Sequence, residues 1–153
     1  MRKLFSLFVV ILSGSILFGA TNVFAQKKMK KEATIWPAAD IKWVEAKDAP
    51  PGTMFASIWG NMTKGSYGAL VKFGQGMNNP LHTHSSEVKA VVVSGAFWYA
   101  PEGGDKKVLG PGSYFMIPSG LKHTSGADPG TVMFQEGPGK FDMKMVAAPK
   151  AKK

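Results

Sequence analysis

Turns rich in glycine and proline divide most of this 153-residue chain into apolar segments too short for ordinary globular helices. No stretch after residue 25 keeps the 3.6-residue apolar period with caps that a helix needs. The expected strands are 53–59, 67–73, 88–93, 96–99, 113–117, 131–135 and 141–146. Ser94-Gly95 predicts a two-residue hairpin turn between the third and fourth of these strands. Short strands at such close spacing predict an all-β sandwich, jelly roll or barrel.

The chain contains no cysteine. This excludes a disulfide framework, thiol catalysis, a cysteine-ligated zinc site and an iron–sulfur cluster. The hydrophobic fraction of 44% argues against disorder, and the length fits a single domain. The fold must therefore be held by its core, or partly by a bound metal.

The first 25 residues have the pattern of a cleaved secretory signal. Arg2 and Lys3 precede an almost wholly apolar run, and Val23-Phe24-Ala25 places small or short residues at the cleavage positions. A retained membrane anchor is the alternative, because the apolar run of about 17 residues reaches the lower limit for a span. We expect a signal peptide at 1–25, a lysine-rich tail at 26–34, one barrel domain at 35–148 and a second lysine-rich tail at 149–153. The mature protein is then periplasmic or secreted, with no membrane contact beyond the signal peptide.

The residues that give the chain its formal net charge of +9 lie outside the expected domain. Residues 32–149 contain ten lysines and ten aspartates or glutamates, and the other lysines lie in the tails and the signal. The expected mature chain has no arginine, and arginine dominates the recognition of phosphates and base edges. We therefore expect no nucleic-acid partner. The simple interpretation of the tails is that they keep a neutral domain soluble; loose adhesion to anionic lipid or cell-wall polymer is the functional alternative.

The histidines are the strongest candidates for chemistry, and the chain has only His82, His84 and His123. Residues i and i+2 of a strand project to the same face, so His82 and His84 could both reach one ion at about 2.0–2.2 Å. His123 follows Pro118-Ser-Gly120 and could arrive from a neighbouring strand. Imidazole suits zinc, copper, iron and nickel. A chance His-x-His pair on a polar loop is the alternative interpretation.

The glycines and prolines around these histidines form two blocks. The first block holds Gly76, His82, His84 and Gly95, and the second holds Gly112, Pro118, Gly120 and His123. In these residues and their spacing the chain resembles the cupins. Leu81-His-Thr-His-Ser85, Val91-Val-Val-Ser-Gly95, Leu109-Gly-Pro-Gly-Ser-Tyr-Phe115 and Gly139-Lys-Phe-Asp142 resemble, more narrowly, a small exported cupin family of unknown function. The resemblance covers roughly residues 36–146 and implies a double-stranded β-helix, the cupin-type jelly-roll barrel, with one metal ion inside.

The chain departs from the usual cupin pattern at the position of a fourth ligand. The first cupin motif has a metal-binding glutamate where this chain has Val88, and the available carboxylate is Glu87, one residue earlier. A shift of one residue turns a side chain to the other face of a regular strand. A turn or bulge at Ser85-Ser86 would return Glu87 to the ion; otherwise the site has three histidines and water. We expect the first arrangement. The second motif also ends in Ala127 instead of its usual asparagine.

The resemblance and the histidines together predict a metal-dependent enzyme that acts on a small-molecule substrate. The expected ligands are His82, His84, Glu87 and His123, and the expected cofactor is one divalent ion of iron, manganese, zinc, nickel or copper. Open coordination positions would support oxidation, isomerisation or lyase chemistry, including dioxygenase chemistry with iron. The alternative is a non-catalytic ligand-binding or sensor cupin with a structural metal, because fold does not fix function. Adhesion through the lysine tails is a third hypothesis. Cupins often dimerise, so a homodimer is also expected.

Overall fold

The computed structural model describes residues 32–47 and 49–147. The expected signal peptide and most of both lysine-rich tails lie outside the described residues. The chain separates into two compact units, residues 1–34 and 35–153, and only the last three residues of the first unit are described. Within the described part, no helix has the length and apolar character needed to cross a membrane.

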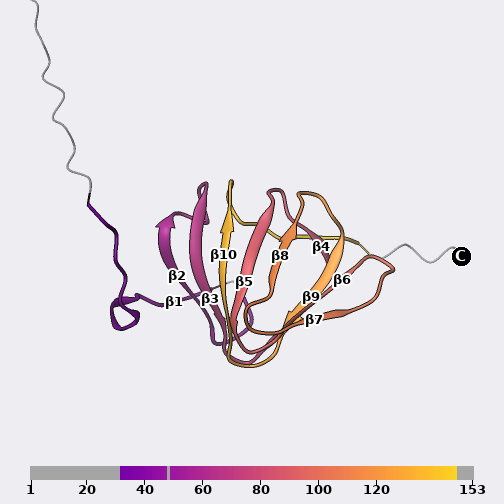
Figure 1. The fold of residues 1–153 in the computed structure, drawn as a ribbon. Helices are drawn as coiled ribbons and strands as arrows, with labels where there is room; N and C mark the ends of the chain where they lie inside the picture. Colours follow the sequence, from indigo (N-terminus) through magenta and orange to yellow (C-terminus); the bar gives the residue numbers. More distant parts are fainter. Residues whose placement is uncertain (1–31, 48, 148–153) are drawn as a thin grey trace, which may run out of the picture. The chain divides into compact units, whose positions relative to one another are not determined.

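Two antiparallel sheets build the second unit (Figure 1). The six-stranded sheet has the order β1 (Val44–Glu45), β2 (Thr53–Gly60), β3 (Tyr67–Phe73), β10 (Thr131–Gly137), β5 (Val88–Ser94) and β8 (Tyr114–Ile117). The five-stranded sheet has the order β11 (Lys144–Met145), β4 (Met77–Thr83), β9 (His123–Ala127), β6 (Phe97–Pro101) and β7 (Lys107–Leu109). The one helical element in the described residues is a 3-10 turn, η1 (Ala38–Asp40). The all-β prediction with low helix content is confirmed.

Several predicted local features are corrected by the structure. Strands β4, β7 and β9 fall outside the seven predicted ranges, although His82 of β4 and His123 of β9 were expected on strands. The predicted strand 141–146 is reduced to the two residues of β11. Ser94-Gly95 does not close a hairpin, because β5 pairs with β10 and β8 whereas β6 pairs with β7 and β9. The turn instead connects the two sheets. Beyond it, Ala96 exchanges hydrogen bonds with the Thr131 hydroxyl, at 3.1 Å to its N–H and 3.0 Å to its carbonyl.

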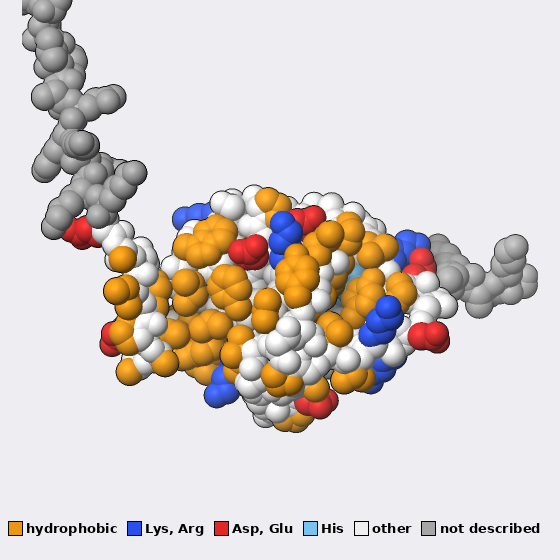
Figure 2. All heavy atoms as spheres, in the orientation of Figure 1, with side chains coloured by type: hydrophobic (Ala, Val, Ile, Leu, Met, Phe, Trp, Pro, Cys, Tyr) orange, Lys and Arg blue, Asp and Glu red, His pale blue; other side chains and the backbone are white. Residues whose placement is uncertain are grey.

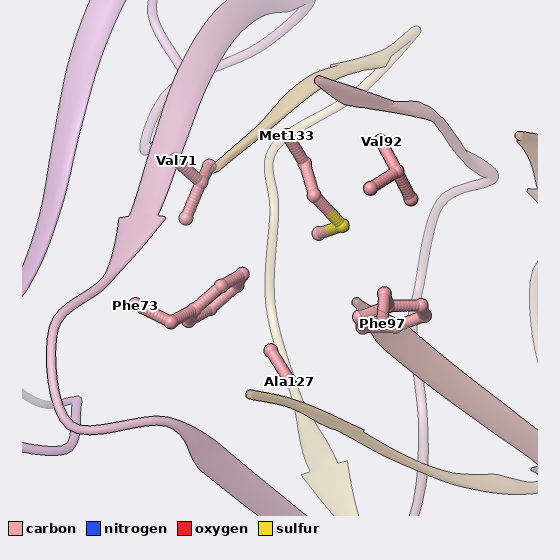
Figure 3. Packing of buried hydrophobic residues seen from close by; sticks show 6 residues of the cluster. All are labelled: Val71, Phe73, Val92, Phe97, Ala127 and Met133. Atoms are coloured by element: carbon pink, nitrogen blue, oxygen red, sulfur yellow. The ribbon is translucent and has the colours of Figure 1, made fainter. Parts of the chain in front are cut away.

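The core lies between the two sheets, and several of its residues line the same cavity as the histidines. Alternation sends Val88, Ala90 and Val92 of β5 inward, where each is buried. The cluster in Figure 3 is formed by Val71, Phe73, Val92, Phe97, Ala127 and Met133, from both sheets. Phe97 also stacks on Phe115, with ring centroids 4.8 Å apart. Each large apolar side chain buried in this way contributes roughly 1.5–3 kcal/mol of stability, which a chain without disulfides needs.

The outward face of the six-stranded sheet carries exposed apolar side chains. Val91, Val93, Tyr114 and Met116 of β5 and β8 all lie there, and apolar side chains are widespread on the face seen in Figure 2. Exposed apolar side chains on neighbouring strands offer surface to a partner. The expected homodimer stays a prediction.

Candidate metal centre

Strands β4 and β9 bring the three histidines together inside the barrel. His82 and His123 are direct register partners on these strands, and His84 follows the last residue of β4. The ring centroids lie 4.2 Å apart for His82 and His123, 5.0 Å for His82 and His84, and 5.2 Å for His84 and His123. One nitrogen from each ring lies within 4.8 Å of the other two. The prediction that the two sequence blocks supply one cluster of imidazoles is therefore met by the geometry.

A backbone carbonyl fixes the orientation of each imidazole. The Nδ1 atoms lie 2.7 Å from the Pro80 carbonyl for His82, 2.6 Å from the Asp142 carbonyl for His84 and 2.9 Å from the Leu121 carbonyl for His123. A carbonyl oxygen only accepts, so each Nδ1 must carry the proton and donate it. The lone pair is then on Nε2 in all three rings. Metal-binding histidines are commonly held in this way, with the second nitrogen donating to a carbonyl or carboxylate.

The remaining nitrogen of His123 has no partner within the protein. His123 is fully buried, and its Nε2 has no hydrogen bond in the described part of the chain. The pKa of His123 is lowered to about 4, mainly by burial; the Leu121 carbonyl opposes this shift, and the neighbouring His82 and His84 add to it. Burial also lowers the pKa of His84. Imidazoles that present Nε2 are ligands that zinc and other late first-row divalent ions accept, so the residues fit a metal.

Glu87 does not join this cluster in the structure. Its carboxylate lies 2.8 Å from Nζ of Lys89, and both side chains are about one-third exposed. Residues 87 and 89 share a face, and Val88 between them is buried and lines the cavity. Ser85 and Ser86 form a bend between β4 and β5, and Glu87 after this bend pairs with Lys89. This placement favours the alternative of three histidines, and coordination by Glu87 stays a prediction.

Asp142, near the end of the described chain, bonds with Ser85 and His84 of the first block. Its carboxylate accepts hydrogen bonds from the Ser85 backbone N–H at 2.7 Å and from the Ser85 hydroxyl at 2.6 Å. These bonds lower the pKa of the Asp142 carboxyl. They also hold the Asp142 carbonyl against Nδ1 of His84. The sequence marked Asp142 only as part of a family resemblance, because its partner lies 57 residues away.

The second block also contacts the first. The Ser119 hydroxyl donates to the Ser85 carbonyl at 2.8 Å, and the Gly120 N–H donates to the His84 carbonyl at 2.9 Å. Gly120 has a φ of 76°, a conformation that favours glycine. Pro118-Ser-Gly120 therefore has two roles: it precedes His123 in the chain, and it holds the backbone of His84 in place.

The histidines open into a cavity of about 580 Å³. Its wall is largely aromatic and aliphatic, formed by Phe55, Val71, Phe73, Met77, Val88, Phe97, Phe115, Ile117, Met133 and Phe141 among others. Gln135 of β10 adds a buried amide to the wall, and its Nε2 donates to the hydroxyl of Tyr67 at 2.6 Å. Sequence reasoning missed Gln135, since one glutamine in an alternating strand has no distinctive pattern. Lys89 is not part of this wall.

The lowered histidine pKa values predict how the stability of the metal-free protein depends on pH. A histidine whose pKa falls from about 6.5 in the unfolded chain to about 4 in the folded one binds its proton more readily when unfolded. The free energy of unfolding in EDTA should therefore be highest above pH 6.5 and fall between pH 6.5 and 4. Urea titrations across this range test the sign. The variant His123→Asn should show a smaller fall, and a stability that rose on acidification would contradict the prediction.

Comparisons with known proteins identify a domain family and one curated relative. The family model for a domain of unknown function, DUF4437, matches residues 25–144. An (R)-mandelonitrile lyase from Granulicella tundricola is 36% identical over 66 residues, which are 43% of this chain and 50% of that protein. The match thus spans only half the length of that curated relative.

Solved structures share the architecture of the two sheets. The structure of KdgF from a Halomonas species has 26% identity and a TM-score of 0.53, and the match covers 70% of this chain and 94% of that one. An RmlC-like cupin from Ralstonia eutropha has 20% identity and a TM-score of 0.59, with 78% of each chain covered.

Proposed function

The chain belongs to the DUF4437 domain family and has the cupin fold, and on this premise we propose that it is a metal-dependent enzyme that acts on a small molecule inside the barrel. The observation that carries the proposal is the buried cluster of His82, His84 and His123 at one wall of a cavity. All three present Nε2, and one Nε2 is buried without a partner.

The roles of the chain's own residues follow from their positions. The three imidazoles would hold the ion, and the carbonyls of Pro80, Leu121 and Asp142 keep them oriented. A bound divalent ion with open positions would polarise an oxygen atom of the substrate. The apolar wall limits the access of water, which strengthens electrostatic interactions inside the cavity. Gln135, held by Tyr67, supplies a fixed amide that can orient a substrate in the same cavity.

Lyase chemistry is the reaction class to test first. The similarity to a protein named (R)-mandelonitrile lyase supports it, and three imidazoles with open metal positions are compatible with carbon–carbon bond cleavage. Oxidation and isomerisation are the further classes. The ion would be iron, manganese, zinc, nickel or copper, all of which accept imidazole.

One observation favours a non-catalytic ligand-binding or sensor cupin as the second candidate. Asp142 is the one carboxylate in the described wall, and Ser85 occupies both of its oxygens. The described wall therefore offers no free carboxylate that could act as a general base, and its other basic side chains of this kind are the three histidines that would hold the metal. A binding module would keep the metal and the cavity but show no turnover.

Elemental analysis of the mature protein tests the proposal. The protein would be purified without added metal or a histidine tag from the periplasm or medium, where we propose that it is exported. We expect about one equivalent of a divalent ion in the wild type and in Glu87→Gln, because Glu87 pairs with Lys89 outside the cluster. Iron or copper would direct activity assays to oxygen uptake, and manganese, nickel or zinc to cyanohydrin cleavage and isomerisation. A protein that neither contains metal nor takes it up on titration would refute the metalloenzyme.

A further inference from the structure

One hydroxyl in the wall of the histidine cavity lacks a hydrogen-bond partner. Thr53, the first residue of β2, lines the cavity with only 5% of its surface exposed, and its Oγ1 has no partner within the described residues. Its backbone is fully bonded, since its N–H donates to the Pro50 carbonyl at 3.1 Å and its carbonyl accepts from the Ala46 N–H at 2.9 Å. Only the side chain is left without a partner.

A second threonine in the same row of the sheet shows what a structural hydroxyl does here. Thr53 and Thr131 are both register partners of Phe73, one on each side of β3. Thr131 is also fully buried, but its Oγ1 contacts both the N–H and the carbonyl of Ala96. Buried hydroxyls in proteins almost always find such partners. The free hydroxyl of Thr53 is therefore the exception in its own sheet.

The charges of the wall define what could bond with Thr53. Among the described residues, the charged side chains that line the cavity are those of Lys47, which is exposed to solvent, and Asp142, which Ser85 holds. The rest of the described lining is mostly aromatic and aliphatic. Burying an ion in such a wall without a counter-charge is costly. The cavity therefore suits an uncharged and mainly apolar molecule.

From these observations we propose that Thr53 is a specificity-determining residue, whose hydroxyl bonds an oxygen or nitrogen of an uncharged, mainly apolar substrate at a point away from its metal-binding group. This inference rests on the proposed function, because the histidine cluster would hold the other end of the substrate. The inference specifies the class of substrate for the proposed enzyme. This substrate is a small molecule with two separate polar groups and no net charge, such as a substituted aromatic alcohol.

Thr53→Val tests the proposal, because valine keeps the shape and removes only the hydroxyl. The probes are benzyl alcohol and its 2-, 3- and 4-hydroxy derivatives, titrated calorimetrically into the zinc-loaded protein. We expect at least one hydroxy derivative to bind the wild type roughly 3- to 10-fold more tightly than benzyl alcohol. In Thr53→Val this preference should disappear, while the affinity for benzyl alcohol stays the same.

Controls separate this inference from the proposed function. The preference should persist in the metal-free protein, which would support Thr53 even if the metal proposal failed. Thr131→Val should instead lower the free energy of unfolding, since it breaks the bonds to Ala96, and Thr53→Val should not. An unchanged preference in Thr53→Val, or no binding of any probe to the wild type, would overturn the proposal and assign the hydroxyl to a structural water.

Discussion

His123→Ala is expected to weaken metal binding by more than a hundredfold. Even residues that only orient a metal ligand contribute about 10- to 100-fold to affinity, and His123 would be a ligand itself. Its ring lies within 5.2 Å of both other histidine rings. It also stacks on Tyr99 at a centroid distance of 5.3 Å. Two remaining imidazoles would be left to hold the ion, and neither can move into the vacated position, because the Pro80 and Asp142 carbonyls fix them.

The loss should also be visible in stability. Metal present at one hundred times its dissociation constant raises the free energy of unfolding of the wild type by about 2.7 kcal/mol. The same metal concentration should leave His123→Ala almost unchanged. Urea unfolding with zinc and with EDTA gives both values, and zinc competition against a chromophoric chelator gives the affinity. Glu87→Gln is the matched control and should behave as the wild type does. A full metal response in His123→Ala, or its loss in Glu87→Gln, would contradict the three-histidine site.

The features that sequence predicted well are those set by short-range spacing. His82 and His84 share a face because they are two residues apart on an extended chain. Gly76, Gly95, Gly112 and Gly120, which the two blocks singled out, all have positive φ values between 76° and 83°. Such backbone conformations depend on local sterics, which a sequence reports directly.

The features that sequence missed depend on partners far along the chain. Strand β9 has the sequence His123-Thr-Ser-Gly-Ala127, with no large apolar residue, yet it is buried because it pairs with β4 on one side and β6 on the other. Ser94-Gly95 has the composition of a hairpin turn, but β10 occupies the place beside β5 that a hairpin partner would need.

Gly126→Ala is expected to destabilise the fold and disturb the metal site together. Gly126 lies in β9, the central strand of its sheet, and pairs with Asn78 of β4 and Trp98 of β6. A β-carbon at this position would overlap both the Met77 carbonyl oxygen and the Trp98 indole. The carbonyl belongs to the backbone of β4, so the clash cannot be relieved by a change of rotamer. The indole is further restrained by Lys106, whose Nζ lies 4.5 Å from the ring centroid.

The strand that must move is the one that carries His82, and this links stability to metal binding. Overpacking costs typically about 1–3 kcal/mol, and here backbone and indole must both shift. Gly68→Ala on β3 is the matched control, because the nearest atoms to its added β-carbon all belong to the half-exposed Trp59 side chain, which can rotate away. Urea unfolding should show a loss of at least about 2 kcal/mol for Gly126→Ala and less than about 1 kcal/mol for Gly68→Ala. Zinc affinity should fall only in Gly126→Ala, since β4 and β9 carry His82 and His123, whereas β2 and β3 carry no histidine. Equal losses in the two variants would show that β4 is not restrained by the close approach at Gly126.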